Sequence, residues 1–392
     1  MLTGLAYIFL GGLGCAWIFT KLKLPGFLGM LLAGILLGPM GWNLLDGLVL
    51  AVSGDLRRLA LVIILARVGL SLDLSVLKTF GVAALLICFV PATLEIVGIT
   101  LLAPYILGVT FLEAALIGTV AAGVSPAVIV PRMLWLTENG YGREKGLPQL
   151  LMAGASADNV YVIILFSALV KMIESGEGWS GASLGWIPPA IACGLGGGVA
   201  AGWGMAKWLG RFGRNDAVAV LVFLSLSFLF MALEQDGRVP FAGLLAIAVT
   251  GVVIQKLLPE TARRLTVTFK GLWTGAEVLL FVLVGALIGV GGVSPAVGMI
   301  ALLVAAGLGF RAAGVWLSLT GTRLDRRERR FCIWVYLPKA TVQAAVGAIP
   351  LGMGLACGNT VLAVAVVSIV LTAPFGALMI DWTCKSLFKR ID

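Results

Sequence analysis

The stretch GTVAAGVSPAVIVPRML, residues 118–134, lies in a segment that is apolar enough to cross a membrane, yet it contains residues that interrupt a helix. Gly123, Ser125 and Pro126 fall near its middle. A proline inside a helix removes a backbone hydrogen bond and clashes with the preceding turn. In lipid, non-helical backbone is tolerated only where it is buried in protein or lines a cavity. The stretch therefore predicts a membrane helix that is broken at its centre.

The composition of the whole chain indicates a membrane protein. Of 392 residues, 60% are hydrophobic and 12% are charged, whereas about 25% are charged in an average soluble domain. Apolar windows of about 20 residues, the length that crosses a bilayer, recur along the whole chain. The first window is therefore a membrane span and not a cleaved signal peptide. The sequence predicts an all-α polytopic protein with about 13 transmembrane helices, at residues 4–20, 25–45, 56–76, 81–106, 111–136, 147–172, 187–209, 216–235, 240–256, 270–292, 297–320, 328–352 and 358–384.

Basic residues are distributed unevenly between the loops. They gather after the odd-numbered spans, as far as Lys389 and Arg390, whereas the loops after even-numbered spans hold only Arg57, Arg58 and Arg238. Lysine and arginine collect on the cytoplasmic side of membranes. This predicts an external N-terminus and a cytoplasmic C-terminus. It also accounts for the net charge of +9, so nucleic acid is not indicated as a partner.

Four charged residues lie deep inside predicted spans. Asp158, in the stretch AGASADNVYVI, falls about 15 Å into its span at about 1.5 Å per residue, and Glu95, Arg311 and Lys339 lie similarly deep in theirs. A charge near the bilayer centre costs at least ~2.5 kcal/mol on insertion scales and faces the bundle interior or a watery cavity. Two acids and two bases at one depth predict two ion pairs, Glu95 with Arg311 and Asp158 with Lys339. Helix packing is the alternative role for each pair.

A second span, 328–352, is also predicted to be broken, because Pro338 lies inside it and is followed directly by Lys339. The two broken spans are the fifth and the twelfth, which are seven spans apart. Because seven is odd, the two halves of the chain would cross the membrane in opposite directions if they were structural repeats. Such inverted repeats are typical of secondary transporters, which bind substrate near the midplane at the repeat interface.

Several strings in the chain resemble those of the monovalent cation/proton antiporter superfamily, most closely its NHA-type sodium/proton antiporters. They are KLPGFLGMLLAGILLGP, ARVGLSLDL, PATLE, SPAVIVPRML with GYGREKGLP after it, the Asp158 segment and PKATVQAA. The resemblance covers nearly the full length and implies an NhaA-like antiporter fold in which the two broken helices cross.

The resemblance also implies a domain organisation and an oligomeric state. A homodimeric scaffold is expected from residues 1–78 and 216–292, and a mobile ion-transporting core from residues 79–172 and 297–385. Residues 187–209 would form the helix that links them.

The family roles are carried over residue by residue. Asp158 matches the first acid of the family's Asp-Asp pair, the partner of Lys339, and Asn159 falls where the second acid, the direct cation ligand, is expected. Glu95 and Arg311 match an additional buried ion pair of the family. In the electroneutral branch the motif is Asn-Asp, so the order in this chain is reversed.

Two interpretations of this departure stay open. In the first, Asp158 itself binds Na⁺ or Li⁺ and Lys339 takes or releases the proton, with an exchange of one for one. Hard alkali cations prefer oxygen ligands, and further oxygens are available on Asn159, Ser125, Ser156 and Thr341. In the second, Asn159 replaces an aspartate, and the chain is transport-impaired or an ion-sensing pseudo-transporter.

The predicted function is therefore that of a secondary active transporter. It exchanges Na⁺ or Li⁺ for H⁺ across the bacterial inner membrane by alternating access, serves pH homeostasis and needs no cofactor; K⁺/H⁺ exchange is an alternative. No soluble tail precedes Met1 or follows Arg390, so we expect no nucleotide-binding regulatory domain.

An enzyme is not indicated. The chain has no histidine, which excludes Ser-His and Cys-His nucleophiles and histidine metal sites. Its six cysteines lack the spacing of metal ligands. A dyad of Ser125 and Lys339 is the one catalytic arrangement left.

Overall fold

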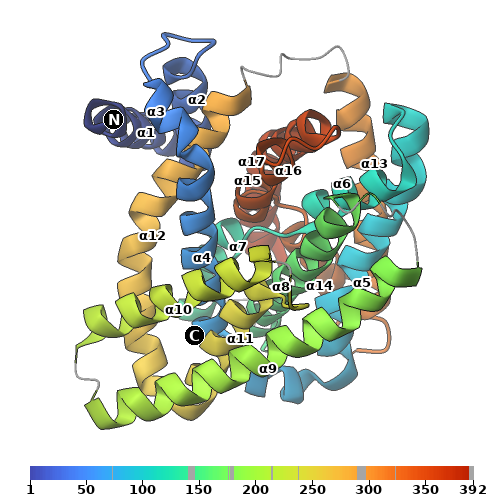
Figure 1. Cartoon of the computed structure of the whole chain (residues 1–392). Helices are drawn as coiled ribbons and strands as arrows, with labels where there is room; N and C mark the ends of the chain where they lie inside the picture. Colours follow the sequence, from blue (N-terminus) through green and yellow to red (C-terminus); the bar gives the residue numbers. More distant parts are fainter. Residues whose placement is uncertain are drawn as a thin grey trace. The chain divides into compact units, whose positions relative to one another are not determined.

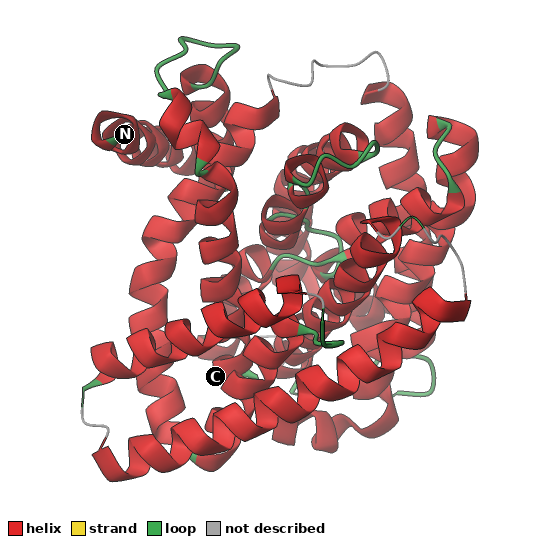
Figure 2. Ribbon diagram, in the orientation of Figure 1, coloured by secondary structure: helices red, strands yellow, loops and turns green. Residues whose placement is uncertain are grey.

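The computed structural model describes residues 1–72, 74–139, 146–174, 176, 181–212, 215–236, 238–288, 297–322 and 324–387. This part of the chain is built from helices joined by loops and turns, without a strand (Figures 1 and 2). The helices are α1 (Leu2–Lys21), α2 (Gly26–Leu37), α3 (Gly47–Ala51), α4 (Ser53–Ser71), α5 (Leu74–Leu107), α6 (Phe111–Ala122), α7 (Pro126–Glu138), α8 (Leu147–Glu174), α9 (Gly181–Phe212), α10 (Asp216–Asp236), α11 (Gly243–Leu257), α12 (Pro259–Ile288), α13 (Val297–Ser318), α14 (Arg326–Val335), α15 (Thr341–Val346), α16 (Ile349–Gly352) and α17 (Gly358–Leu387).

Each predicted span contains a helix, but some boundaries differ. The span predicted at 25–45 ends early, at Leu37 of α2. The span predicted at 270–292 begins earlier, because Pro259 and Glu260 suit the first turn of α12. Eight helices of the described residues are long and apolar enough to cross a membrane, and three shorter apolar segments accompany them. The count of about 13 stays a prediction.

Some residues named above are not part of the described structure. They are Asp73 of ARVGLSLDL, residues 140–145 of GYGREKGLP, residues 289–292 of a predicted span, and Lys389 and Arg390.

Both predicted helix breaks are confirmed. The helix that contains Gly123 ends with α6 at Ala122 and resumes with α7 at Pro126. The helix that contains Pro338 ends with α14 at Val335 and resumes with α15 at Thr341. The two breaks touch, because the backbone N–H of Ser125 donates to the carbonyl oxygen of Pro338 at 2.9 Å.

The two interrupted helices also begin in the same way. Thr110 and Glu113 form a capping box at the start of α6, and Asp325 and Glu328 form one at the start of α14. In each box the side chain before the helix accepts from a backbone N–H of the first turn, and the glutamate accepts from the capping residue. Both helices therefore have fixed starting points, and their breaks lie about three turns further on.

The chain divides into two compact units by internal packing. The first comprises Met1–Gly54, Leu74–Val162 and Val278–Asp392, and the second comprises Asp55–Asp73 and Ile163–Glu277. The predicted division into scaffold and core concerns relative movement, and it stays a prediction.

In the first unit, glycines let α13 approach α5 closely. A side-chain carbon at Gly314 would lie 2.6 Å from the Cα of Pro91, and one at Gly307 would lie 2.9 Å from the side chain of Ile99. These glycines lie one turn to either side of Arg311, so the close packing brings its guanidinium to α5. In the same unit, α15 and α16 pack beside α17 (Figure 1).

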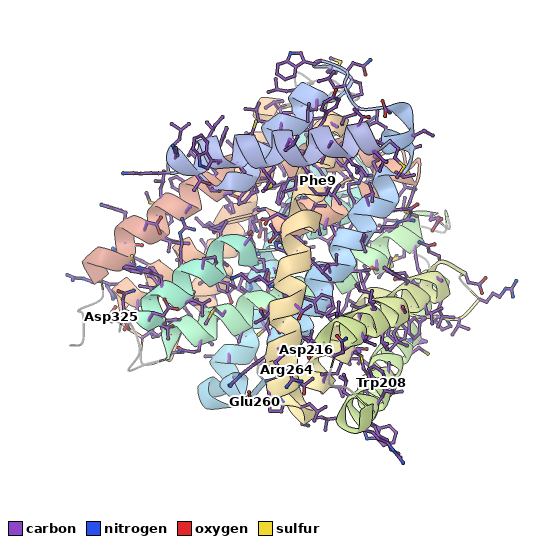
Figure 3. All side chains as sticks on the ribbon, turned by 90° about the vertical axis from the view of Figure 1, so that its left-hand side faces the viewer. Phe9, Trp208, Asp216, Glu260, Arg264 and Asp325 are labelled. Carbon is purple, nitrogen blue, oxygen red and sulfur yellow. The ribbon has the colours of Figure 1, made fainter. Side chains whose placement is uncertain are left out.

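In the second unit, α9 packs closely on α11. A side-chain carbon at Gly198 would lie 2.7 Å from the carbonyl oxygen of Ala246, and the hydroxyl of Thr250 donates to the Gly198 carbonyl at 3.2 Å. The start of α10 is tied to α12 by an ion pair at 3.2 Å between Asp216 and Arg264, which lie side by side in Figure 3. This unit contains none of the four deep charges predicted from the sequence.

Candidate functional site

The four predicted charges form one cluster in the first unit. Glu95 lies on α5, Asp158 on α8 and Arg311 on α13, while Lys339 lies in the break between α14 and α15. Their side chains are at most 1% exposed. Buried charges are stable only when they are paired and hydrogen-bonded, and each of these four is.

Arg311 is the centre of the cluster. Its Nη1 donates to Glu95 Oε2 at 2.7 Å, which confirms the predicted Glu95–Arg311 pair. Its Nη2 donates to both carboxylate oxygens of Asp158, at 3.1 and 3.0 Å. One guanidinium therefore holds both buried acids.

The same guanidinium also binds the ends of both interrupted helices. Its Nε donates to the carbonyl oxygen of Tyr336, just after α14, and its Nη1 donates to that of Ala122, the last residue of α6. The last carbonyls of a helix have no partner within it and carry partial negative charge. A cation is well suited to both positions.

The predicted pair between Asp158 and Lys339 is replaced by a different pairing. Lys339 Nζ donates to Glu95 Oε2 at 2.7 Å and to the Ala122 carbonyl at 3.1 Å. Glu95 thus lies between the two cations, and Asp158 is paired with Arg311 alone among the described residues. The sequence gives the depth of each charge but not the direction in which its side chain leaves the helix, so it cannot distinguish the two pairings.

The cluster has no net charge, because two carboxylates face one guanidinium and one ammonium. The next residue after Asp158 is the neutral Asn159, so α8 adds only one acid to this cluster. The cluster as a whole therefore gains a positive charge when it takes up either a cation or a proton.

Gln343 of α15 belongs to the site and is missed by the sequence analysis. Its Nε2 donates to the carbonyls of Val120, Ala121 and Gly123, at 3.0, 3.3 and 2.7 Å. Within the described structure its side chain accepts no bond itself but donates to the last carbonyls of α6, on either side of the Ala122 carbonyl that Arg311 and Lys339 bind. The available signal was an amide one helical turn after Lys339 in a span with few polar residues.

Several polar atoms at the helix breaks are buried without a hydrogen-bond partner among the described residues. They are both side-chain polar atoms of Asn159, Ser125 Oγ, the Tyr336 hydroxyl, Thr341 Oγ1 and Gln343 Oε1. Their residues are at most 2% exposed. A buried polar group left unpaired costs roughly 1–3 kcal/mol. The helix breaks therefore hold several buried oxygens that are free to accept a hydrogen bond or to bind a cation.

Ser156, the remaining predicted ligand, has a different environment. Its hydroxyl donates at 2.9 Å to the carbonyl of Met152 in its own helix. Within the described structure, no hydrogen bond joins it to the helix breaks. Its role as a ligand stays a prediction.

Tyr336 is a second residue that the sequence analysis misses. Its ring lies 5.6 Å from the guanidinium carbon of Arg311, a distance at which a cation is attracted to an aromatic face. Its hydroxyl reaches α8 at Gly154, where a side-chain carbon would lie 2.2 Å away. Gly154 therefore makes room for the tyrosine one turn before Asp158.

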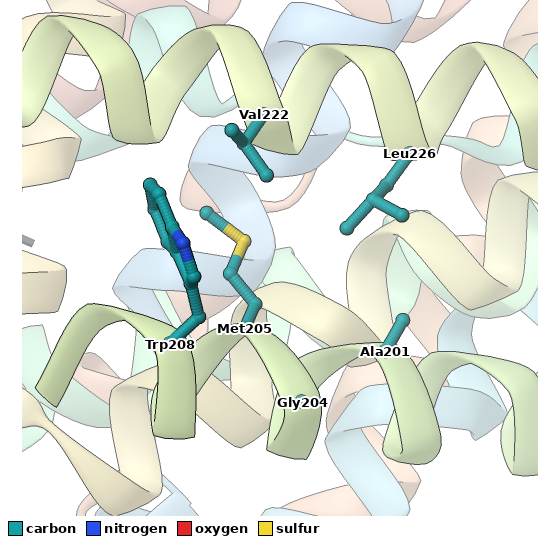
Figure 4. Close-up of a pocket in the computed structure, with 6 residues that line it drawn as sticks. All are labelled: Ala201, Gly204, Met205, Trp208, Val222 and Leu226. Atoms are coloured by element: carbon teal, nitrogen blue, oxygen red, sulfur yellow. The ribbon is translucent and has the colours of Figure 1, made fainter. Parts of the chain in front are cut away.

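The hollow drawn in Figure 4 is unrelated to this cluster. It has a volume of about 280 Å³ and lies in the second unit. Only apolar or small residues line it, namely Ala201, Gly204, Met205, Trp208, Val222 and Leu226. It offers no oxygen-rich side chain for an alkali cation.

A helical protein whose two interrupted helices end at a buried charge cluster has the architecture of a secondary ion transporter. The comparisons agree: a family profile described as sodium/hydrogen exchanger, transmembrane, matches residues 5–386. The chain belongs to this sodium/hydrogen exchanger family.

Relatives in the family are similar over most of their length. Human sodium/hydrogen exchanger 9B2 is 31% identical over 401 residues, covering 97% of this chain and 73% of the relative. Human sodium/hydrogen exchanger 9B1 is 29% identical over 390 residues, covering 94% and 73%. These relatives are exchangers by name, so the predicted superfamily and the prediction that the chain is not an enzyme are confirmed.

A solved structure supports the fold. The sodium proton antiporter MjNhaP1 from Methanocaldococcus jannaschii, at pH 8, superposes with a TM-score of 0.78 and covers 98% of this chain and 97% of its own. Because its sequence is only 17% identical, this similarity establishes the fold and nothing about function. The predicted antiporter fold class is thereby confirmed.

Proposed function

We propose that this exchanger moves Na⁺ or Li⁺ against H⁺ across a bacterial inner membrane by alternating access, with Asp158 as the carboxylate that couples the two ions. The observation that carries the proposal is the position of Asp158. It is completely buried, beside two interrupted helices, and its carboxylate is bonded to a single nitrogen of Arg311.

The geometry leaves Asp158 able to bind. A carboxylate has about four acceptor positions, and the one guanidinium nitrogen that bridges its two oxygens does not use all of them. A proton and an alkali cation compete for such a group, since both neutralise the same charge. Competition of this kind couples the two gradients when only the loaded protein changes its access.

Lys339 is the proposed second participant in proton transfer. Its ammonium lies within hydrogen-bonding distance of Glu95 and Ala122, so a cation bound nearby repels it and favours release of its proton. Binding one monovalent cation and releasing one proton leaves the charge of the cluster unchanged. We therefore expect an exchange of one for one.

The moving domain, the dimer and the orientation in the membrane are proposed from the sequence. Residues 79–172 and 297–385 would move as the ion-transporting core against a homodimeric scaffold of residues 1–78 and 216–292, with 187–209 as the link. The excess of basic residues in the loops after odd-numbered spans supports an external N-terminus and a cytoplasmic C-terminus.

The test is proton flux in proteoliposomes. Adding NaCl or LiCl to vesicles that contain the unmodified protein should drive protons across the membrane, and Asp158→Asn should abolish this flux. Asp216→Asn, which removes a surface carboxylate of the second unit, is the matched control and should leave the flux intact. Counting the charge moved per turnover checks the ratio of one for one.

Two results would overturn the proposal. Flux in Asp158→Asn equal to that of the unmodified protein would remove Asp158 from the mechanism. A folded, unmodified protein that moves no protons with Li⁺, Na⁺ or K⁺ would favour an ion-sensing role. Flux with K⁺ alone would keep the exchange and change the substrate.

A further inference from the structure

We infer that neutral oxygens at the break between α6 and α7 complete the binding of the transported cation beside Asp158, and that Gln343 is the ligand that sets the specificity among alkali cations. The inference rests on the proposed function and adds to it a set of ligands and a residue that selects between ions.

The orientation of the Gln343 amide is fixed by its neighbours. Its Nε2 faces three backbone carbonyls, of Val120, Ala121 and Gly123. The reversed amide would place its oxygen against the same three oxygens, which is repulsive. Gln343 Oε1 therefore points away from the end of α6, and nothing in the described structure donates to it although the residue is completely buried.

Contacts around Gly123 bring the unpaired amide oxygen of Asn159 to the same helix end, and Ser125 and Thr341 are neighbours in sequence of the residues in contact there. The Oδ1 of Asn159 lies 3.3 Å from the position that a side-chain carbon of Gly123 would occupy. The Gly123 carbonyl accepts from Gln343 at 2.7 Å, and Ser125 follows two residues later. Thr341 precedes Val342, whose side chain lies 2.8 Å from that same carbon position.

The chemistry of these groups suits a monovalent alkali cation. Amide and hydroxyl oxygens are hard ligands, which alkali cations accept. The Asp158 carboxylate, bonded to a single nitrogen of Arg311, keeps acceptor positions with which it can complete the site. A site of neutral oxygens gives little advantage to a divalent ion, and small differences in its size distinguish Li⁺, Na⁺ and K⁺.

The position of Gln343 also links binding to the backbone. The amide that offers its oxygen to the cation holds the last carbonyls of α6 with its nitrogen. A cation that binds Oε1 therefore alters the hydrogen bonds from Gln343 Nε2 to the last carbonyls of α6. These bonds join α15 to α6 at the point where the two interrupted helices meet.

The first test uses Thr341→Val, which has nearly the same shape and removes one unpaired hydroxyl. Because that hydroxyl has no partner in the described structure, its loss should leave the melting temperature without alkali salt unchanged or raised. The increase in melting temperature on adding NaCl should shrink, and KM for Na⁺ should rise about tenfold. A residue with a purely structural role would lower the melting temperature and leave KM unchanged.

The second test uses Gln343→Leu. We expect a change of at least tenfold in the ratio of the KM values for Li⁺ and Na⁺. Gln149→Leu is the matched control, because Gln149 also has an unpaired buried carbonyl oxygen but lies on α8 about 15 Å before Asn159. It should keep the KM ratio of the unmodified protein.

Ser125→Ala provides an independent check if Gln343→Leu does not fold, and it should also raise KM for Na⁺. The inference is overturned if Thr341→Val and Ser125→Ala both keep the KM values and salt-dependent melting of the unmodified protein while that protein exchanges ions. Such a result leaves the role of Asp158 intact. Absence of exchange in the unmodified protein overturns the proposed function instead.

Discussion

The two helix breaks of the first unit resemble each other in architecture and differ in chemistry. Each follows a helix that begins with a capping box, and each has a terminal carbonyl bonded to Arg311. The break after α6 presents carbonyl oxygens, those of residues 120–123, whereas the break after α14 and the helix beyond it supply the donors Lys339 and Gln343. The side-chain hydrogen bonds between the two breaks are therefore accepted by the first and donated by the second, whereas the backbone bond from Ser125 to Pro338 runs the other way.

This difference shows how similar helices can build an asymmetric site. A helix end with exposed carbonyls is an incomplete cation site. Here a guanidinium, an ammonium and an amide occupy it. An alkali cation that enters must bind beside these groups or replace one of them.

Arg311→Gln should remove the one group shared by both breaks. The change leaves Glu95 with only Lys339 and leaves Asp158 buried without its cation, which costs about 3–5 kcal/mol for a broken buried pair. Thermal melting in detergent should show the largest loss of any single change in the cluster. Arg132→Gln, which removes a surface pair with Asp381 at 2.8 Å, should cost at most about 1 kcal/mol. Equal losses in the two variants would contradict the central role of Arg311.

Lys339→Arg should keep the positive charge at the second break and remove its ability to release a proton, since arginine stays protonated at every accessible pH. Exchange at neutral pH should fall about tenfold or more, and its dependence on pH should flatten. Proton flux measured between pH 6 and pH 9 checks this. A pH profile identical to that of the unmodified protein would exclude Lys339 from proton transfer.

Gly314→Ala should separate the helices that carry Glu95 and Arg311. The added carbon would lie 2.6 Å from the backbone of Pro91, which cannot move aside cheaply, so we expect a loss of about 1–3 kcal/mol. Gly309→Ala, in the same helix with nothing within 4 Å of the added carbon, should be neutral or stabilising by up to about 1 kcal/mol. A lower melting temperature for Gly314→Ala, with an unchanged or higher one for Gly309→Ala, would support the close packing. Equal changes in melting temperature for the two variants would argue against it.

Thr110→Ala and Asp325→Ala should have the smallest effects and test the similarity of the two helices. Each removes the first residue of a capping box, which is worth about 1 kcal/mol. The losses in melting temperature should be alike, and exchange at saturating Na⁺ should persist. A large loss of exchange in one variant alone would show that the two helix starts are not equivalent.

Much of the site was predictable from the sequence because lipid makes each polar residue costly. Glu95, Asp158, Arg311 and Lys339 stand out against an apolar background, and Pro126 and Pro338 mark the breaks for a local reason. Gln343 and Tyr336 could not be predicted, because a single amide or phenol in a span is not distinctive until its neighbours in space are known. The bonds of Asp158 to Arg311 and of Lys339 to Glu95 could not be predicted, because the depth of a charge does not give the direction in which its side chain leaves the helix.

The sequence by itself determined that this chain is a helical membrane protein of the cation/proton antiporter type, with two helices broken at glycine and proline and four charges held at one depth. These properties follow from composition and from the local chemistry of the backbone. Only the tertiary structure decided that Glu95 lies between two cations, that Arg311 holds Asp158, and that Gln343 binds the end of α6. Those contacts depend on the rotation of each helix about its axis and on the close packing at Gly307 and Gly314, which bring together residues far apart in the chain.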